Sequence, residues 1–352
     1  MSLGTIGALG GCGAPEPGDV ASLAQPLGEP VGDRPNYEER VAHYACNRSR
    51  ADPAAINWPE FPAVPPLLWH DQLAQSGRAH SLDMRNTPCF QHNSCNGQDP
   101  FTRIKSFYKD PFVTLGENIA AGVQDGQIVV HNWIEEIGAP VGETGHREST
   151  FSADFTHHGL GYAAGGTRFQ GYWTQDFAGQ SPRPAIPALA SGAHFPVTTN
   201  AGGSVTFGTV YYSKTGVNAD TVQVVVDGNA AALKRVNGTT AHGAWEGAIA
   251  IGAGCHRYYF RAVAGGQVYV YPDAGTIGVA TNGTMGCALY MAGGVSKDPM
   301  GGGDGGGANP DGGGGGYYGG HGGCEVAGRP LPVGTIAPIL VAVLAIARRR
   351  RR

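Results

Sequence analysis

The sequence carries little charge. Aspartate, glutamate, lysine and arginine make up 15% of its 352 residues, and the formal net charge at pH 7 is −4. An acidic chain with so few cations offers no electrostatic attraction to a polyanion. We therefore expect no nucleic-acid partner.

Motifs of several common enzymes are missing as well. None of the seven cysteines belongs to a C-x-x-C pair, so a zinc ribbon is not supported, and this cysteine usage favours an oxidising compartment. The chain contains no G-x-S-x-G elbow and no papain-like cysteine signature. These absences argue against a serine or cysteine hydrolase.

Glycine and proline are plentiful, with 58 and 24 residues, and they indicate long irregular connections. The length of the chain allows two domains. Shifts in composition divide it into an N-terminal export segment with a spacer, two domains, a glycine-rich tether and a C-terminal tail. In that order, the segments are residues 1–35, 36–182, 188–291, 292–323 and 324–352.

The first domain has the pattern of an α+β fold. Apolar residues at helical spacing predict three helices, and aromatic runs bounded by glycine predict two antiparallel strands. These elements are expected at Tyr37 to about Arg50, Asp71–Arg85, Asp125–Ile137, 155–163 and 171–177.

Three further expectations concern single positions in this domain. The charged side chains Glu38, Glu39 and Arg40 should lie opposite the apolar face of the first helix. Residues 116–118 should form an acidic turn before the third helix. His80, on the apolar face of the second helix, should be an ordinary core histidine with its hydrogen bonds satisfied.

Two segments place polar side chains where chemistry is possible. His92 lies between Cys89 and Cys95, which can form a disulfide if the loop turns back on itself. Cys46 could instead pair with either of them, and the sequence leaves these pairings open. Glu136 lies at the inward edge of the third helix and needs a partner, because an unpaired buried carboxylate is costly.

Short motifs follow one another in a recognisable order. They are Asn47-Arg48, Ala79–Met84, Phe90-Gln-His92, Gly116–Ala120, Trp133–Glu136, Gly145-His-Arg147, Gly159–Tyr162 and Tyr172–Phe177. In this order and spacing they resemble the CAP superfamily, which is the SCP-type extracellular domain of cysteine-rich secretory proteins, antigen 5 and pathogenesis-related proteins. The resemblance covers about residues 36–180.

The resemblance implies a CAP-type α-β-α sandwich with a cleft. Two histidines and two acidic residues project into the cleft of this family, and the matching positions are His92, Glu117, Glu136 and His146. This chain departs from the common bacterial pattern, because residues 138–144 lengthen the loop before His146. The pair His157-His158 could compete for a metal.

Two imidazoles and two carboxylates are a suitable set for Zn²⁺ or another divalent cation, and they could also act as a general acid and base. In that interpretation the metal ligands are His92 and His146, with Glu117 and Glu136 as further ligands. The alternative is that the four side chains hydrogen-bond one another in a polar pocket that only stabilises the fold.

The second domain has the pattern of an all-β sandwich of the immunoglobulin or fibronectin type. Alternating and β-branched runs occur at 204–213, 221–226, 244–251, 257–263 and 267–271. Cys255 and Cys287 flank the last strands and are the expected disulfide pair. Some of its aromatic residues should pack in the core and others should be ordinary exposed tyrosines; an aromatic strip that binds carbohydrate is the alternative.

The N-terminal segment ends in Leu9-Gly10-Gly11-Cys12, which resembles a bacterial lipobox in which Cys12 would be lipidated. A flexible tail with a free Cys12 is the alternative. At the other end, Cys324 precedes an apolar span, Leu331–Ala347, and an arginine cluster. This order resembles the MYXO-CTERM sorting tail; the alternative is a short membrane span that acts as a plain anchor.

These features together predict an exported protein at the cell envelope or cell surface. We expect the first domain to bind a small hydrophobic ligand, a glycan, a metal or a surface protein, with the second domain as a spacer. The membrane would be reached through the tail and through a lipid on Cys12. A metal-dependent hydrolase acting on peptide or glycan is the alternative, and we favour a protein without enzymatic activity.

The sorting interpretation predicts a shortened mature protein. Mass spectrometry of the envelope form should show a chain that ends near Cys324, because sorting removes the apolar span and the arginine cluster. An intact Arg352 terminus on the surface protein would contradict it.

Overall fold

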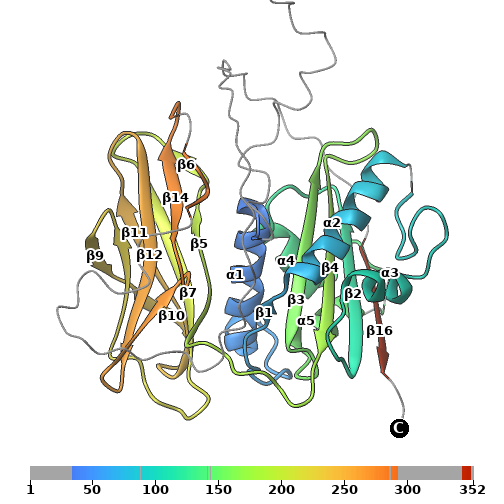
Figure 1. Cartoon of the computed structure of the whole chain (residues 1–352), viewed down its shortest axis with the longest axis horizontal. Helices are drawn as coiled ribbons and strands as arrows, with labels where there is room; N and C mark the ends of the chain where they lie inside the picture. The colour runs from blue at the N-terminus through green and yellow to red at the C-terminus, as the bar shows by residue number, and fades with distance from the viewer. Residues whose placement is uncertain are drawn as a thin grey trace, which may run out of the picture.

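The computed structural model describes residues 34–87, 89–140, 142, 144–284, 287–291 and the backbone of 343–349. Two domains lie side by side in Figure 1, a mixed domain on the right and an all-strand domain on the left, with helix α1 between them. Helix and strand contents of 24% and 36% confirm a mixed α and β protein.

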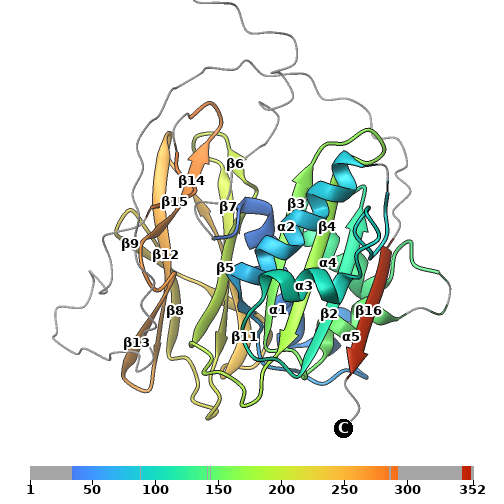
Figure 2. The ribbon, with the colours of Figure 1, turned by 45° about the vertical axis from the view of Figure 1, so that its right-hand side comes forward.

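The first domain is a β-sheet between two layers of helices (Figure 2). Its strand order is β1-β3-β4-β2, with β1 parallel to β3 and the other neighbours antiparallel. Helices α2 and α3 cover one face of the sheet, and α1, α4 and α5 cover the other. The elements are α1 Tyr37–Ala51, the 3-10 turn η2 Pro53–Ile56, β1 Leu68–Trp69, α2 Asp71–Asn86, α3 Pro100–Phe107, β2 Thr114–Ala121, α4 Gly126–Glu135, α5 Gly145–Phe151, β3 His157–Ala164 and β4 Gly171–Gly179.

The three predicted helices and two predicted strands of this domain are present, but the predicted turn at 116–118 is wrong. These residues lie in the middle of strand β2, which is buried along its whole length. The strand was not predicted because the polar residues Glu117 and Asn118 interrupt the apolar run that a fully buried strand usually shows. Helices α3 and α5 were also absent from the prediction.

Helix α2 lies directly on strand β3 because β3 carries glycine at two positions. A Cβ atom on Gly159 would come within 2.0 Å of the backbone nitrogen of Ala74, and one on Gly161 within 2.0 Å of that of Arg78. Any side chain at these positions would push the helix away from the sheet. The close approach fixes α2 and the loop that follows it, which carries His92.

Helix α1 is buried on nearly all sides, so the solvent-facing position predicted for part of its charged residues is wrong. Glu39 and Arg40 are 0% and 4% exposed. The Glu39 carboxylate accepts hydrogen bonds from Arg78 at 2.7 and 3.0 Å, which compensates its burial. The prediction failed because neither side of α1 faces solvent: Glu39 lies against Arg78 and Tyr162 of the first domain, and the second domain packs on the side that carries Tyr37, Val41 and Tyr44.

The second domain contains two facing sheets with an apolar core between them. One sheet has the order β10-β11-β7-β5, and the other has β15-β14-β12-β8-β9, with β13 paired to β12 and β6 to β14. The strands are β5 Leu189–Phe195, β6 Thr198–Thr199, β7 Ser204–Tyr212, β8 Thr221–Val226, β9 Asn229–Ala232, β10 Lys234–Gly238, β11 His242–Ala250, β12 Cys255–Ala264, β13 Gln267–Tyr271, β14 Thr276–Thr281 and β15 Tyr290–Met291.

Each of the five strands predicted for this domain is present, and two tight turns carry the expected residues. Asp227-Gly228 joins β8 to β9 and Gly265-Gly266 joins β12 to β13, all four with positive φ. Tyr258 is fully buried and Tyr259 is 5% exposed, whereas Tyr269 is exposed, which is the expected mixture of core and surface tyrosines.

The two domains share helix α1 as part of both cores. Tyr37, Val41 and Tyr44 pack against Ala193 of β5 and Val210 of β7. Strand β7 carries glycine where it meets the helix, because a Cβ on Gly208 would lie 2.5 Å from the hydroxyl of Tyr44. The second domain is therefore packed directly onto the first.

Backbone residues Val343–Arg349 form strand β16, which pairs antiparallel with β2. The described part of the expected membrane span Leu331–Ala347 is thus a strand and not a helix. Such pairing satisfies backbone groups at the edge of a sheet. No helix within the described ranges is long and apolar enough to cross a membrane. Cys12 and Cys324 lie outside the described residues.

The shared core predicts that the first domain depends on the second. A chain that ends at residue 182 exposes the outer face of α1, and burial of each large apolar side chain contributes about 1.5–3 kcal/mol. We expect its free energy of unfolding to be lower by about 3 kcal/mol or more than that of a chain ending at residue 291, measured by tryptophan fluorescence in urea. Equal midpoints for the two chains would show that the domains are independent.

Candidate functional site

Three of the four residues predicted to form a cleft are buried and Glu136 is partly exposed, and the structure brings them together as two pairs. His92 contacts Glu117, and Glu136 contacts His146. The exposed fractions are 4% for His92 and 0% for Glu117 and His146. Each pair joins a loop or helix end to a neighbouring element, so the two pairs are best described separately.

A disulfide holds the first pair in place. Cys89 bonds to Cys95 across the loop that carries His92, which confirms the direct pairing, while Cys46 is free and buried. Arg103 of α3 also holds the loop, because its Nη1 donates to the carbonyl oxygen of His92 at 3.1 Å. His92 Nδ1 lies 2.8 Å from Glu117 Oε1.

Glu117 has two further neighbours that the sequence did not reveal. Arg103 Nη2 forms an ion pair with Glu117 Oε2, and Asp176 of β4 lies directly opposite Glu117 in the strand register. Burial raises the pKa of Glu117 to about 7, although the Arg103 charge acts against this shift. Burial and then the charge of Glu117 raise the pKa of Asp176 well above its usual range. The pair therefore releases its protons at higher pH than isolated carboxyl groups do, while the ion pair with Arg103 favours the charged form of Glu117.

The sequence near Arg103 contains the signals of a helix start, whereas no local signal identifies Asp176 as a residue of the site. Asp99 accepts a hydrogen bond from the amide of Thr102, and Pro100 occupies the first turn, which is a recognisable helix start. Helix α3 and its arginine could thus have been found. Asp176 is one polar residue of a buried strand, and only the pairing of β4 with β2 places it beside Glu117.

The second pair forms where two helices meet. Glu136 ends α4 in the left-handed conformation, with a φ of 54°. Its carboxylate contacts Nδ1 of His146 and accepts a hydrogen bond from the backbone nitrogen of Arg147 at 2.9 Å. The carboxylate thus binds the first turn of α5, where a negative charge is favoured. His146 and the amide of Arg147 are therefore the partners that the inward position of Glu136 required.

Arg147 has a structural role beside the second pair. Its Nε donates to the carbonyl oxygen of Ile134 at 2.6 Å, and its guanidinium carbon lies 3.4 Å from the ring centroid of Trp58. Trp58 in turn donates to Glu135 at 2.9 Å. Arg147 therefore ties α5 to the end of α4 beside the second pair.

The two pairs approach β2 from different sides. Glu117 and Asn118 are neighbours on the strand, so their side chains point to opposite faces of the sheet. Asn118 Nδ2 lies 3.4 Å from the carbonyl oxygen of His146 and donates to Gln175 at 3.2 Å. Within the described ranges, no group of three or more His, Cys, Asp or Glu side chains is close enough to hold one metal ion.

Three further histidines of the first domain, His80, His157 and His158, are buried. His80 is fully buried, as expected for a core histidine, and its Nε2 bonds to the carbonyl oxygen of Gln91 at 3.0 Å. Its Nδ1 has no hydrogen-bond partner among the described residues, so the expectation of fully satisfied hydrogen bonds is met only in part. His157 and His158 point to opposite faces of β3, so they do not form a joint site. His158 Nε2 lies 2.6 Å from His43 Nδ1, and burial lowers the pKa of His43 to about 4.

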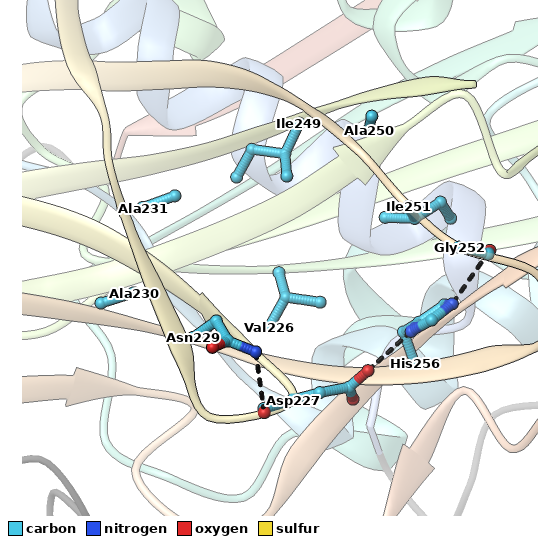
Figure 3. Close-up of a pocket in the computed structure, with 10 residues that line it drawn as sticks. All are labelled: Val226, Asp227, Asn229, Ala230, Ala231, Ile249, Ala250, Ile251, Gly252 and His256. Carbon is cyan, nitrogen blue, oxygen red and sulfur yellow. Dashed lines mark hydrogen bonds and ion pairs between the residues drawn. The ribbon is translucent and has the colours of Figure 1, made fainter. Parts of the chain in front are cut away.

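A pocket of about 220 Å³ lies in the second domain, away from the predicted residues (Figure 3). Val226, Ile249 and Ile251 form much of its lining, with Asp227 and His256 on one side. His256 Nδ1 lies 2.6 Å from Asp227 Oδ2, and its Nε2 lies 3.0 Å from the carbonyl oxygen of Gly252. Both ring nitrogens thus face acceptors, and the hydrogen bond to Asp227 raises the pKa of His256.

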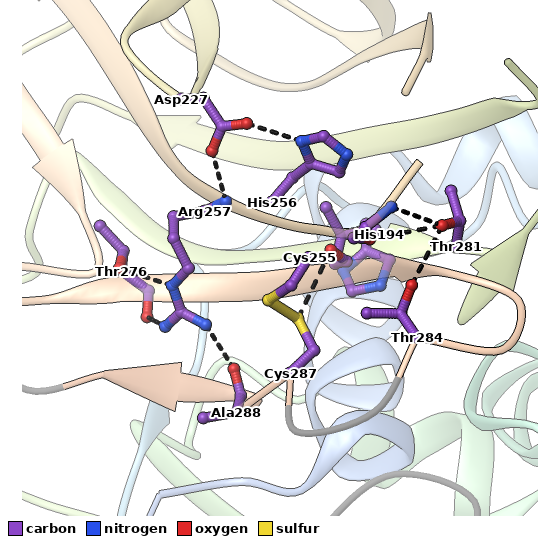
Figure 4. The surroundings of a disulfide bond; sticks show 12 residues. His194, Asp227, Cys255, His256, Arg257, Thr276, Thr281, Thr284, Cys287 and Ala288 are labelled. Atoms are coloured by element: carbon purple, nitrogen blue, oxygen red, sulfur yellow. Dashed lines mark hydrogen bonds and ion pairs between the residues drawn. A yellow bond between two sulfur atoms is a disulfide. The ribbon is translucent and has the colours of Figure 1, made fainter. Parts of the chain in front are cut away.

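The predicted disulfide between Cys255 and Cys287 is present next to this pocket (Figure 4). It joins the first residue of β12 to the segment before β15. Arg257 strengthens the same connection, because its Nη2 donates to the carbonyl oxygen of Thr276 at 2.9 Å. The final strands of the second domain are thereby fixed to its core.

Comparison with known proteins identifies the first domain. Residues 62–177 match the family model described as CAP, the cysteine-rich secretory protein family. The chain is 37% identical over 118 residues to the uncharacterized protein YkwD of Bacillus subtilis (strain 168), across 33% of this chain and 40% of that protein. The chain thus spans less than half the length of this relative. The chain contains a CAP domain, as its motifs predicted.

Solved structures give weaker likenesses. An extracellular protein containing a SCP domain from Bacillus anthracis str. Ames is 29% identical across 33% of this chain and 35% of that chain, with a TM-score of 0.27. An outer surface protein from Borrelia burgdorferi is 19% identical across 34% of this chain and 80% of that chain, with a TM-score of 0.28.

The buried pair His43 and His158 predicts a pH effect on stability. His43 has a pKa of about 4 in the fold and 6.5 ordinarily, so its contribution is complete above pH 6.5. As the pH falls from 6.5 towards 4, only the unfolded chain takes up the proton. The free energy of unfolding then decreases by up to about 1.4 kcal/mol per pH unit.

The pKa values of Glu38 and Glu117 are raised to about 7, so these two groups stabilise the fold as the pH falls. The contribution of His43 is therefore obtained by comparing the wild type with a variant that lacks this histidine. In urea unfolding between pH 6.5 and 4, the His43→Phe variant should lose stability less steeply than the wild type. Parallel curves for the two proteins would contradict a neutral buried His43.

Proposed function

We propose that this chain is an exported CAP-domain protein that binds its ligand at the two histidine–glutamate pairs, and that a divalent metal such as Zn²⁺ is part of that ligand. The second domain is part of the same unit, and we assign it to the immunoglobulin-like class. The proposal is a binding function, because four residues in two pairs support recognition better than any particular reaction.

The orientation of the two imidazole rings carries the proposal. In both pairs the histidine directs Nδ1 at a glutamate, so a metal on either ring would bind Nε2. Metal-binding histidines commonly donate the other ring nitrogen to a carboxylate, which fixes the tautomer and raises the basicity of the ligand. Among the described residues, Nε2 of His146 is buried and has no hydrogen-bond partner.

This orientation assigns different roles to the two residue types. In each pair the histidine would be the ligand of a separate metal ion, His92 on one face of the sheet and His146 on the other, whereas Glu117 and Glu136 orient the rings. Arg103 and the amide of Arg147 bind the remaining carboxylate oxygens, which further disfavours the glutamates as direct ligands. A bound zinc ion would leave coordination positions for a small ligand or a polar group of a partner.

A metal-dependent surface hydrolase acting on peptide or glycan is the second candidate. The observation in its favour is the carboxyl pair of Glu117 and Asp176, which releases its protons at higher pH than isolated carboxyl groups do and could act as a general acid. We rank it below binding because both carboxyl groups are completely buried.

Export is supported by the disulfides Cys89–Cys95 and Cys255–Cys287, which form in oxidising compartments. The family that matches residues 62–177 is itself described as secretory, which agrees with export. Lipidation at Cys12, the glycine-rich tether and sorting at Cys324 belong to the same proposal and rest on the sequence. A small hydrophobic ligand, a glycan or a surface protein remain the candidate partners of the bound metal.

Zinc titration of the full chain by calorimetry tests the proposal. We expect stoichiometric binding in the wild type, loss of binding in a His92→Ala/His146→Ala variant, and a decrease of about 10–100-fold in affinity in Glu136→Gln. Affinity should also decrease as the pH falls through the histidine range, because the neutral ring is the ligand.

His131→Ala is a matched control, because His131 is exposed on α4 and lies outside both pairs. It should bind zinc like the wild type. Unchanged affinity in the double variant would show that the assigned residues are not the site. Cleavage of a peptide or peptidoglycan library by the zinc-loaded wild type, lost in Glu117→Gln, would favour the hydrolase.

A further inference from the structure

A continuous series of hydrogen bonds runs from the second domain to His146. It begins at the carbonyl oxygen of Ala190 in β5, which lies 3.1 Å from His43 Nε2. His43 Nδ1 lies 2.6 Å from His158 Nε2, and His158 Nδ1 lies 2.8 Å from Gln175 Nε2. Gln175 then accepts from Asn118, whose amide also lies 3.4 Å from the carbonyl oxygen of His146.

The direction of every bond in this series is determined by its first member. A carbonyl oxygen can only accept, so Ala190 requires a proton on His43 Nε2. The neutral His43 then accepts at Nδ1, which requires a proton on His158 Nε2. His158 Nδ1 in turn accepts from the Gln175 amide, and each group is satisfied with both imidazoles neutral.

These side chains lie where no water can replace a lost partner. Asn118, His158 and Gln175 are 0% exposed, and His43 is 1% exposed. A buried donor or acceptor that loses its partner costs about 1–3 kcal/mol. The arrangement therefore has little freedom to change at one end without a change at the other.

Helix α1 makes a second, independent connection to the helix that carries His146. Arg50, which is completely buried, donates to the carbonyl oxygen of Thr150 at 2.6 Å and to that of Ser152 at 3.0 Å, at the end of α5. On its other side α1 is bound to the second domain, since Tyr44 donates to Glu246 at 2.8 Å. Figures 1 and 2 both show α1 between the two domains.

From these contacts we propose that His43 and His158 are positioning residues through which the docked second domain sets the place of His146. The second domain then determines part of the geometry of the candidate site, although none of its residues binds the metal. This inference rests on the proposed function for its consequence in metal affinity, but the position of α5 can be tested without any metal.

The alternative is that the second domain only covers the apolar side of α1. In that case its loss would weaken the whole first domain without a particular effect on α5. Hydrogen exchange distinguishes the two, because it reports the opening of α5 and of α2, on the opposite face of the sheet, in one experiment.

The experiment uses the metal-free full chain and hydrogen exchange measured by mass spectrometry. In His43→Phe, which keeps an aromatic ring but breaks the series, we expect amides of residues 145–151 to exchange about 10-fold faster and those of residues 71–86 to stay unchanged. Gly208→Val would displace Tyr44 and undock the second domain, so exchange of residues 145–151 should accelerate by a larger factor than exchange of residues 71–86.

His157→Phe is the matched control, since His157 is the next residue on β3 and points away from the series. It should leave α5 unchanged. The proposal is overturned if residues 145–151 keep their wild-type exchange in His43→Phe, or if residues 71–86 accelerate by the same factor.

A zinc titration of the same variants separates this inference from the proposed function. Where the wild type binds zinc, His43→Phe should bind about 10-fold more weakly, and unchanged affinity would contradict the inference. Where the wild type does not bind zinc, the proposed function fails, and the exchange of α5 still decides whether the second domain positions His146.

Discussion

The burial of helix α1 on two sides is the constraint on which the rest of the structure depends. One side faces the sheet and α4, and the other faces strands β5, β7 and β11 of the second domain. Because water is excluded from both, its polar side chains must be paired inside the protein. Glu39 pairs with Arg78, Arg50 binds backbone carbonyls, and His43 joins the two domains.

The candidate site follows from the same requirement. Glu117 is completely buried and the side chain of Glu136 is 7% exposed, and each carboxylate contacts a histidine and a second donor. The result is two rings with a fixed orientation on either side of β2. A protein that only needed a stable core could have used apolar residues here at less cost. The presence of two such pairs therefore favours a binding function.

Much of this could be predicted from local sequence. Periodicity placed α2 and α4, the spacing of Cys89 and Cys95 allowed their bridge, and motif order gave the residues of both pairs together with the CAP domain. Tertiary contacts determined what local patterns could not show. Asp176 lies beside Glu117 only through strand register, and the charged side of α1 looked exposed because its cover comes from residues far along the chain.

The central claim is that each glutamate holds its histidine so that Nε2 is the atom offered to a metal. A crystal structure of the full chain soaked with zinc, with anomalous data collected at the zinc edge, tests it directly. The account predicts anomalous peaks about 2.0–2.1 Å from Nε2 of His92 and His146, with the Nδ1 contacts to Glu117 and Glu136 preserved. Zinc bound to the glutamate oxygens, or no peak at either ring, would contradict it.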